Sequence, residues 1–187
     1  MDAFGWPQAI LLAVAAQRLL EMAVARRNTA RLLAEGAREA GAAHYPLFVL
    51  LHAGWLLALF LAVPADAPVN GWLLAVFLLL QAGRVWVIAT LGRFWTTRII
   101  TLDGAPLVRR GPFRWVRHPN YLVVAGELAV LPLAFGNVWL AVAATLLNIP
   151  LTLHRIRVEE EALRDRQGTA GGAGRWTGLS GRAPPAA

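Results

Sequence analysis

Cysteine and lysine are both absent from this chain of 187 residues. Without cysteine there is no disulfide, no thiolate nucleophile and no cysteine metal ligand, and the redox state of the compartment is not indicated. Without lysine, all 18 basic side chains are arginines, which face 11 acidic ones and leave a net charge of +7. A basic balance can indicate a nucleic-acid partner, but these arginines lie between long apolar runs. That arrangement favours a membrane protein without a nucleic-acid partner.

The hydrophobic residues, 57% of the chain, are gathered in five runs. Three of them are close to the ~20 residues that cross a hydrocarbon core of ~30 Å. Two shorter runs follow and are joined by Gly136-Asn137, which predicts a helical hairpin with a short first arm. The five runs are residues 4–25, 44–63, 71–91, 121–135 and 138–153. The fold class predicted is an all-α integral membrane protein of about five transmembrane helices, the last two a helical hairpin.

Domain organisation follows from a change in composition near residue 165. Residues 1–165 are predicted to form one membrane-embedded domain. Residues 166–187 are rich in Gly, Ala, Pro and Arg and predict a disordered, low-complexity tail. The chain begins with Met1-Asp2, without a basic region or a small-residue cleavage pattern, which argues against a signal peptide.

The arginines predict the topology. Segments 26–43, 92–120 and 154–187 hold four, six and six of them, whereas the connections 64–70 and 136–137 hold none. With five spans, the three arginine-rich segments fall on one side of the membrane, which the positive-inside rule makes the cytoplasmic side. The expected location is an integral membrane position, in a bacterial inner (plasma) membrane, with membrane lipids around the helices.

Two polar stretches fall on this predicted cytoplasmic face. One is RHPNYL at 117–122, and the other is RIRVEEEAL at 155–163, where Arg155 and Glu159 are spaced to share a helix face. One interpretation is an interfacial belt and a solvated helix end, with arginines near lipid phosphates. The other is a pocket for a charged ligand, in which arginine meets a carboxylate and glutamate meets a cation or hydroxyl.

GPFRWVRHPNYL at 111–122, followed by RIRVEEEAL, resembles the signature of the isoprenylcysteine carboxyl methyltransferase family. Upstream, the segments RNTARLLAEGAREAGAAHYPLFVLLH and GRVWVIATLGRFWTTRII resemble a bacterial branch associated with O-methylation of long-chain alkylpyrones or alkylresorcinols. The resemblance implies an integral membrane O-methyltransferase that uses S-adenosyl-L-methionine. It also implies a lipophilic small-molecule acceptor drawn from the bilayer, methylated on a carboxylate or a hydroxyl. The tail of this chain departs from the tyrosine-containing end that relatives have.

The resemblance also implies particular site residues. The cofactor contacts it implies are Leu107, Val108, Phe113, His118, Pro119, Asn120, Tyr121 and Glu159, with Arg98 as a weaker candidate. Arg155 is expected to hold an acceptor oxyanion. A phenolic acceptor would also need a base, for which His118 or Glu160 are the candidates. Pro119 is expected to fix the start of the fourth helix.

Ionisable residues also lie inside the predicted spans, where such groups are usually paired or line a cavity. Arg18 and Glu21 are expected to pair with each other or to face the substrate cavity, and Arg84 raises the same question. Glu127 is either a functional residue or an interhelical partner. His44 and His52, eight residues apart, are interpreted as structural or substrate-channel residues, with no metal site expected. Two rival functions stay open: a membrane NADPH-dependent lipid reductase, and a non-catalytic lipid-binding protein.

Overall fold

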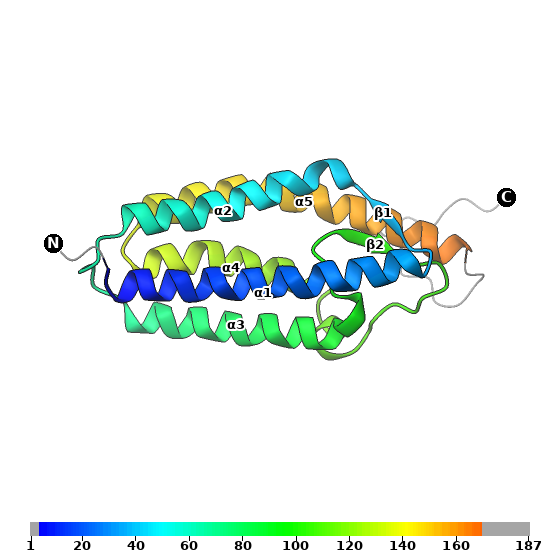
Figure 1. Ribbon diagram of the computed structural model, residues 1–187, viewed down its shortest axis with the longest axis horizontal. Helices are drawn as coiled ribbons and strands as arrows, with labels where there is room; N and C mark the ends of the chain where they lie inside the picture. The colour runs from blue at the N-terminus through cyan, green and yellow to red at the C-terminus, as the bar shows by residue number, and fades with distance from the viewer. Residues whose placement is uncertain (1–3, 170–187) are drawn as a thin grey trace.

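The computed structural model describes residues 4–169. In it, five α-helices pack side by side in an elongated bundle (Figure 1). Their bounds are α1, Trp6–Ala34; α2, Tyr45–Ala62; α3, Gly71–Leu91; α4, Pro119–Ala134; and α5, Val138–Thr169. Four of them are long and apolar enough to cross a membrane, whereas α4 is an apolar helix of 16 residues. The helical prediction is confirmed, and the fifth span stays a prediction. The predicted tail, from residue 170 onward, lies outside the described residues.

The helices begin and end where the sequence places proline, asparagine and glycine. Pro119 is the first residue of α4, as expected, because proline lacks the N–H that a first turn leaves unpaired. Asn70 caps α3, and its Oδ1 accepts hydrogen bonds of 3.1 Å from the backbone N–H groups of Trp72 and Leu73. Gly136, with φ +74°, turns the chain between α4 and α5, which pack against each other as the predicted hairpin.

Large apolar side chains cover the outside of the bundle as well as its core. Leu50, Leu61 and Leu79 are more than 70% exposed, as expected of side chains that face lipid. Inside, Leu59, Phe77 and Leu131 belong to one buried cluster that joins α2, α3 and α4. The outer surface of the bundle is therefore suited to contact with lipid, and its interior is a packed apolar core.

One end of the bundle carries a small sheet that the all-α prediction missed. Strand β1, Arg38–Ala40, pairs antiparallel with β2, Ile99–Thr101. Each strand has three residues, too few to leave an alternating pattern in the sequence. Figure 1 shows this sheet beside the C-terminal part of α5, so the described parts of the arginine-rich segments share one end of the bundle.

Beside this sheet, surface ion pairs join the segment between α1 and α2 to the segment between α3 and α4. Arg38 binds Asp103 at 2.9 Å, and Arg98 binds Glu39 at 2.8 Å. These pairs are partly exposed and contribute little individually. Together with the pairing of β1 and β2, they join segment 92–117 to the end of the bundle, where α4 and α5 bring the polar side chains together.

Candidate active site

Tyr121 is the centre of a polar group at the start of α4. Its hydroxyl donates a hydrogen bond of 2.6 Å to Oε2 of Glu159 and accepts one of 2.9 Å from Nε of Arg155. Arg155 and Glu159 lie one turn apart on α5, so one hydroxyl on α4 joins two charged side chains of opposite sign. The two short motifs therefore meet in space, and the Tyr121 hydroxyl bridges Arg155 and Glu159.

Arg155 is held from three sides. Its Nη2 donates a hydrogen bond of 2.7 Å to the carbonyl oxygen of Thr97, and its Cζ lies 5.1 Å from the ring centroid of Phe48. Only 9% of the residue is exposed. Among the side chains described, residues 4–164, no hydrogen bond uses its Nη1. The guanidinium is thus fixed in orientation and keeps one donor group available for an anionic or carbonyl oxygen.

His118 lies between two carboxylates. Its Nδ1 is 3.7 Å from Oε2 of Glu159, and its Nε2 is 3.6 Å from Oε1 of Glu160. Glu160 also faces Nη1 of Arg117 at 3.4 Å and Nη2 of Arg164 at 3.7 Å. The structure therefore brings His118, Tyr121, Arg155, Glu159 and Glu160 together, as the sequence predicts. We call these five residues the Tyr121 cluster.

The other predicted cofactor contacts are placed elsewhere. Leu107 and Val108 line a cavity of about 430 Å³ with residues 91–94, 106, 109 and 110, and no member of the Tyr121 cluster lines it. Phe113, in the short helix η3 (Gly111–Arg114), packs on the buried cluster of Ala25, Val87 and Trp95. Arg98 is bound by Glu39 and lies over the ring of Tyr45. The described contacts do not join these residues to the Tyr121 cluster.

Asn120 lies between Pro119 and Tyr121 in the first turn of α4. Its Oδ1 is buried and has no hydrogen-bond partner among the described residues. A buried carbonyl oxygen without a donor costs about 1–3 kcal/mol, so the position favours a ligand that brings an N–H or O–H group. Pro119 is buried and fixes the backbone next to it.

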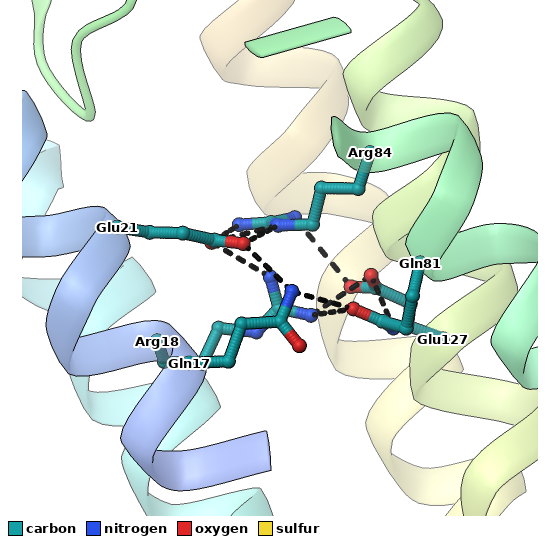
Figure 2. A network of polar contacts seen from close by, with 6 residues as sticks. All are labelled: Gln17, Arg18, Glu21, Gln81, Arg84 and Glu127. Atoms are coloured by element: carbon teal, nitrogen blue, oxygen red, sulfur yellow. Dashed lines mark hydrogen bonds and ion pairs between the residues drawn. The ribbon is translucent and has the colours of Figure 1, made fainter. Parts of the chain in front are cut away.

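A second polar group lies deeper in the bundle, between α1, α3 and α4 (Figure 2). Arg84 binds both carboxylate oxygens of Glu21 through Nε at 2.9 and 2.8 Å, and Arg18 binds Glu127 at 2.8 Å. Arg18 also pairs with Glu21 at 2.9 Å, as expected from their spacing. The charges of the two arginines and two glutamates sum to zero. Glu127 is thus an interhelical partner, which was one of its two expected roles.

Two glutamines complete this group, which we call the buried network: Gln17, Arg18, Glu21, Gln81, Arg84 and Glu127 (Figure 2). Nε2 of Gln17 donates to Oε1 of Gln81 at 2.9 Å, and Nε2 of Gln81 donates to Oε1 of Glu127 at 2.9 Å. The glutamines interrupt apolar runs, so their sequence positions did carry a signal. Thr97, whose backbone carbonyl oxygen accepts a hydrogen bond from Arg155, had no such signal in the sequence, because every residue has a backbone carbonyl.

Two histidines contact the ring of Phe48 on α2. His44, the last residue of the short helix η1 (Ala42–His44), and His52 on α2 lie four residues to either side of Phe48. His44 also contacts His154 of α5, edge to face, at 5.1 Å between centroids. Among the side chains that the structure describes, residues 4–164, no group of three or more His, Asp or Glu is placed to hold a metal ion.

Comparison with known proteins identifies the relatives of this chain. A protein of Bacillus subtilis, given only as uncharacterized protein YpbQ, is 37% identical over 153 residues, which cover 80% of this chain and 91% of that protein. An uncharacterized protein of Haemophilus influenzae is 26% identical over 155 residues, which cover 80% and 90%. Residues 73–165, from α3 to the Tyr121 cluster on α5, match the isoprenylcysteine carboxyl methyltransferase (ICMT) family. The chain therefore belongs to the ICMT family of membrane-bound methyltransferases.

Proposed function

We propose that this protein transfers the methyl group of S-adenosyl-L-methionine to an oxygen of a lipophilic acceptor, at the end of the bundle that carries the Tyr121 cluster. The observation that supports this proposal most directly is the junction of Tyr121, Arg155 and Glu159, because it joins the two motifs of the family at one place. The acceptor we propose is a prenylcysteine-like carboxylate or the hydroxyl of a long-chain alkylpyrone or alkylresorcinol, as in the bacterial branch the sequence resembles.

The residues at this end fit the chemistry of the cofactor. The orphaned Oδ1 of Asn120 suits the amino group of an adenine or of an amino acid, and the Glu159 carboxylate suits a cationic group. The cavity beside Leu107 and Val108, about 430 Å³, has the size of a small-molecule site. His118, Pro119, Asn120, Tyr121 and Glu159 would hold one part of the cofactor, with Leu107, Val108 and Phe113 on another. When bound, the cofactor supplies an electrophilic methyl group.

Arg155 is the residue we propose for the acceptor. Methyl transfer to an oxygen mainly requires alignment, with reacting atoms ~3–3.5 Å apart, and no protein nucleophile. The available Nη1 of Arg155 would hold an acceptor oxyanion while Tyr121 and Thr97 keep the guanidinium in place. For an acceptor that arrives protonated, His118 and Glu160 are the bases that the sequence predicts.

We further propose that α4 is the fifth membrane helix and that the arginine-rich end faces the cytoplasm of a bacterium. A helix of 16 residues is ~24 Å long, short of a ~30 Å hydrocarbon core, so residues before Pro119 would complete the crossing at the interface. The apolar outer surface of the helices gives a long-chain acceptor lateral access from the bilayer.

Calorimetric titration with S-adenosylhomocysteine in detergent tests the proposal. We expect saturable binding by the full chain, and loss of binding in His118→Ala and Glu159→Ala. Asp103→Asn, which alters an exposed ion pair with Arg38, is the matched control and should bind normally. Binding of NADPH instead would favour a reductase, and binding of neither ligand would favour a non-catalytic lipid-binding protein. A variant with a family-like tail in place of 166–187 would show whether that segment limits binding.

A further inference from the structure

A second cavity lies at the end of the bundle opposite the Tyr121 cluster. It measures about 390 Å³, within the range of small-molecule sites, and lies between the start of α1, the loop 64–70 and α3. Figure 1 shows these three elements together at the end where the chain begins. Trp6, Ile10, Val69 and Leu74 contribute to its apolar wall, and Asp66 is the one charged residue among the described residues that line it.

The loop that closes this cavity is held at both ends. Just before the loop, the carbonyl oxygen of Val63 accepts a hydrogen bond of 2.8 Å from Nε2 of Gln8, a residue of α1 that is only 3% exposed. At the end of the loop, the backbone N–H of Asn70 donates a hydrogen bond of 2.8 Å to the carbonyl oxygen of Ala134, the last residue of α4. The loop is therefore tied to α1 and α4, which fixes the shape of the cavity.

Asp66 is the one ionisable residue in the part of the bundle around this cavity. The segments 4–16, 56–80 and 128–150, which form this part, contain no other. The side chain of Asp66 is exposed, and it makes no hydrogen bond or ion pair with another of the described residues. Since the wall of the cavity is apolar and the charge at its rim is negative, the cavity suits a molecule with an apolar part and a cationic group.

Three exposed tryptophans indicate where the membrane surface lies at this end. Trp6, Trp72 and Trp139 belong to the first turns of α1, α3 and α5 and are 80%, 80% and 84% exposed. Tryptophan is enriched at the level of the lipid headgroups, where its ring contacts apolar chains and its N–H meets water. The loop with Asp66 lies beside the starts of α1 and α3, and hence at the same level. Its carboxylate is therefore placed among headgroups, above the acyl chains.

The residues at the rim favour one kind of cationic headgroup. A protonated primary amine has three N–H groups that a carboxylate can accept, whereas a quaternary ammonium has none and is bound mainly by several aromatic faces. Trp6 is the one aromatic residue among the described residues that line the cavity. A carboxylate beside a single aromatic ring thus fits a primary amine better than a quaternary one.

We propose that this cavity binds a phospholipid with a primary-amine headgroup, of the phosphatidylethanolamine class, in the leaflet at the arginine-free end of the bundle. The ammonium group binds the carboxylate of Asp66 beside the ring of Trp6, and the acyl chains pack on Ile10 and Leu74. This site lies at the opposite end from the Tyr121 cluster and depends on neither the cofactor nor the acceptor of the proposed function.

Native mass spectrometry of the full chain in detergent tests the preference for an amine. The probes are phosphatidylethanolamine and phosphatidylcholine with the same acyl chains. We expect the wild type to bind phosphatidylethanolamine about 2–5-fold more tightly, the effect of one exposed ion pair. Asp66→Asn should bind the two lipids equally, whereas Asp103→Asn, which alters an exposed carboxylate at the other end, should keep the wild-type preference. Ala67→Phe, which places a ring in the cavity, should weaken the binding of both lipids.

The absence of lysine allows a second test, which identifies the site directly. A carbodiimide joins a carboxylate to an amine beside it, and this chain has no lysine side chain to compete with the amine of the lipid. With phosphatidylethanolamine in detergent, we expect the lipid adduct at Asp66 and much less of it at the exposed carboxylates of Glu35 and Asp103. The proposal is overturned by equal wild-type affinities for the two lipids, by an unchanged preference in Asp66→Asn, or by adducts that are not enriched at Asp66.

Discussion

Glu127 offers the sharpest test of the buried network, because its side chain is only 5% exposed and its partners come from two other helices. It accepts a hydrogen bond of 2.9 Å from Gln81 and pairs with Arg18 at 2.8 Å and Arg84 at 3.5 Å. Glu127→Leu removes these contacts and leaves the network with two cations and one anion. Hydrogen bonds to a charged group contribute about 1.5–3 kcal/mol each, and breaking a buried ion pair costs about 3–5 kcal/mol.

We therefore expect Glu127→Leu to lower the free energy of unfolding by about 3–5 kcal/mol, measured by denaturant titration in detergent micelles. The double variant Arg18→Met/Glu127→Leu restores neutrality, and it should be more stable than the sum of the single effects predicts, by about 1–3 kcal/mol. Glu35→Gln breaks a pair whose side chains are 42% and 55% exposed, and should cost about 0.2–1 kcal/mol. A cost for Glu127→Leu no larger than that of Glu35→Gln, or additive single effects, would refute the reasoning.

Three further predictions concern the site, a turn and the topology. Tyr121→Phe removes the hydroxyl that bridges Arg155 and Glu159. We expect kcat/KM to fall about 10–100-fold with the fold intact, because each lost hydrogen bond involves a charged group. An unchanged kcat/KM would contradict the role of the hydroxyl. Gly41→Ala should lower the free energy of unfolding by more than about 1 kcal/mol, because φ is +61° and the new Cβ would collide with the His44 ring. Gly36→Ala, with φ +93° and open space, should cost less, and the opposite order would be inconsistent with the steric explanation. The chain has no cysteine, so a single introduced cysteine, Asp66→Cys or Asp103→Cys, reports the side of the membrane on which it lies. An impermeant maleimide should label Asp66→Cys in intact cells and Asp103→Cys only after lysis. The reverse labelling pattern would contradict the proposed orientation.

The sequence allowed most of the helices and part of the site to be predicted, for identifiable physical reasons. Apolar runs long enough to cross a bilayer identify α1, α2 and α3, and the two shorter runs on either side of Gly136-Asn137 predict α4 and α5. His118 lies near Tyr121, and Arg155 near Glu159, because the two residues of each pair belong to one short motif. The two motifs lie near each other because α4 and α5 are joined by a short turn. In both cases the information lies within a few residues.

Contacts between distant segments could not be predicted in this way. The pairing of β1 with β2 joins residues more than 50 positions apart and involves only three residues on each strand. The sequence indicated that Arg18, Arg84 and Glu127 needed partners inside the membrane, but not which side chain would meet which. The separation of Leu107 and Val108 from the Tyr121 cluster depends on how segment 92–118 folds over the bundle, which is decided by tertiary contacts such as Arg155 with Thr97.

The distribution of charge in the buried network has a consequence for how the chain enters the membrane. Arg18 and Glu21 already form a neutral pair on α1, which leaves the ribosome before α3 and α4 do. An arginine at the centre of a lone helix costs about 2.5–3.5 kcal/mol on insertion scales. When α3 follows, Arg84 finds Glu21 in place, and when α4 follows, Glu127 finds Arg18. Each new charge thus meets a waiting counter-charge, so the order of synthesis can guide the assembly of the bundle from α1 onward.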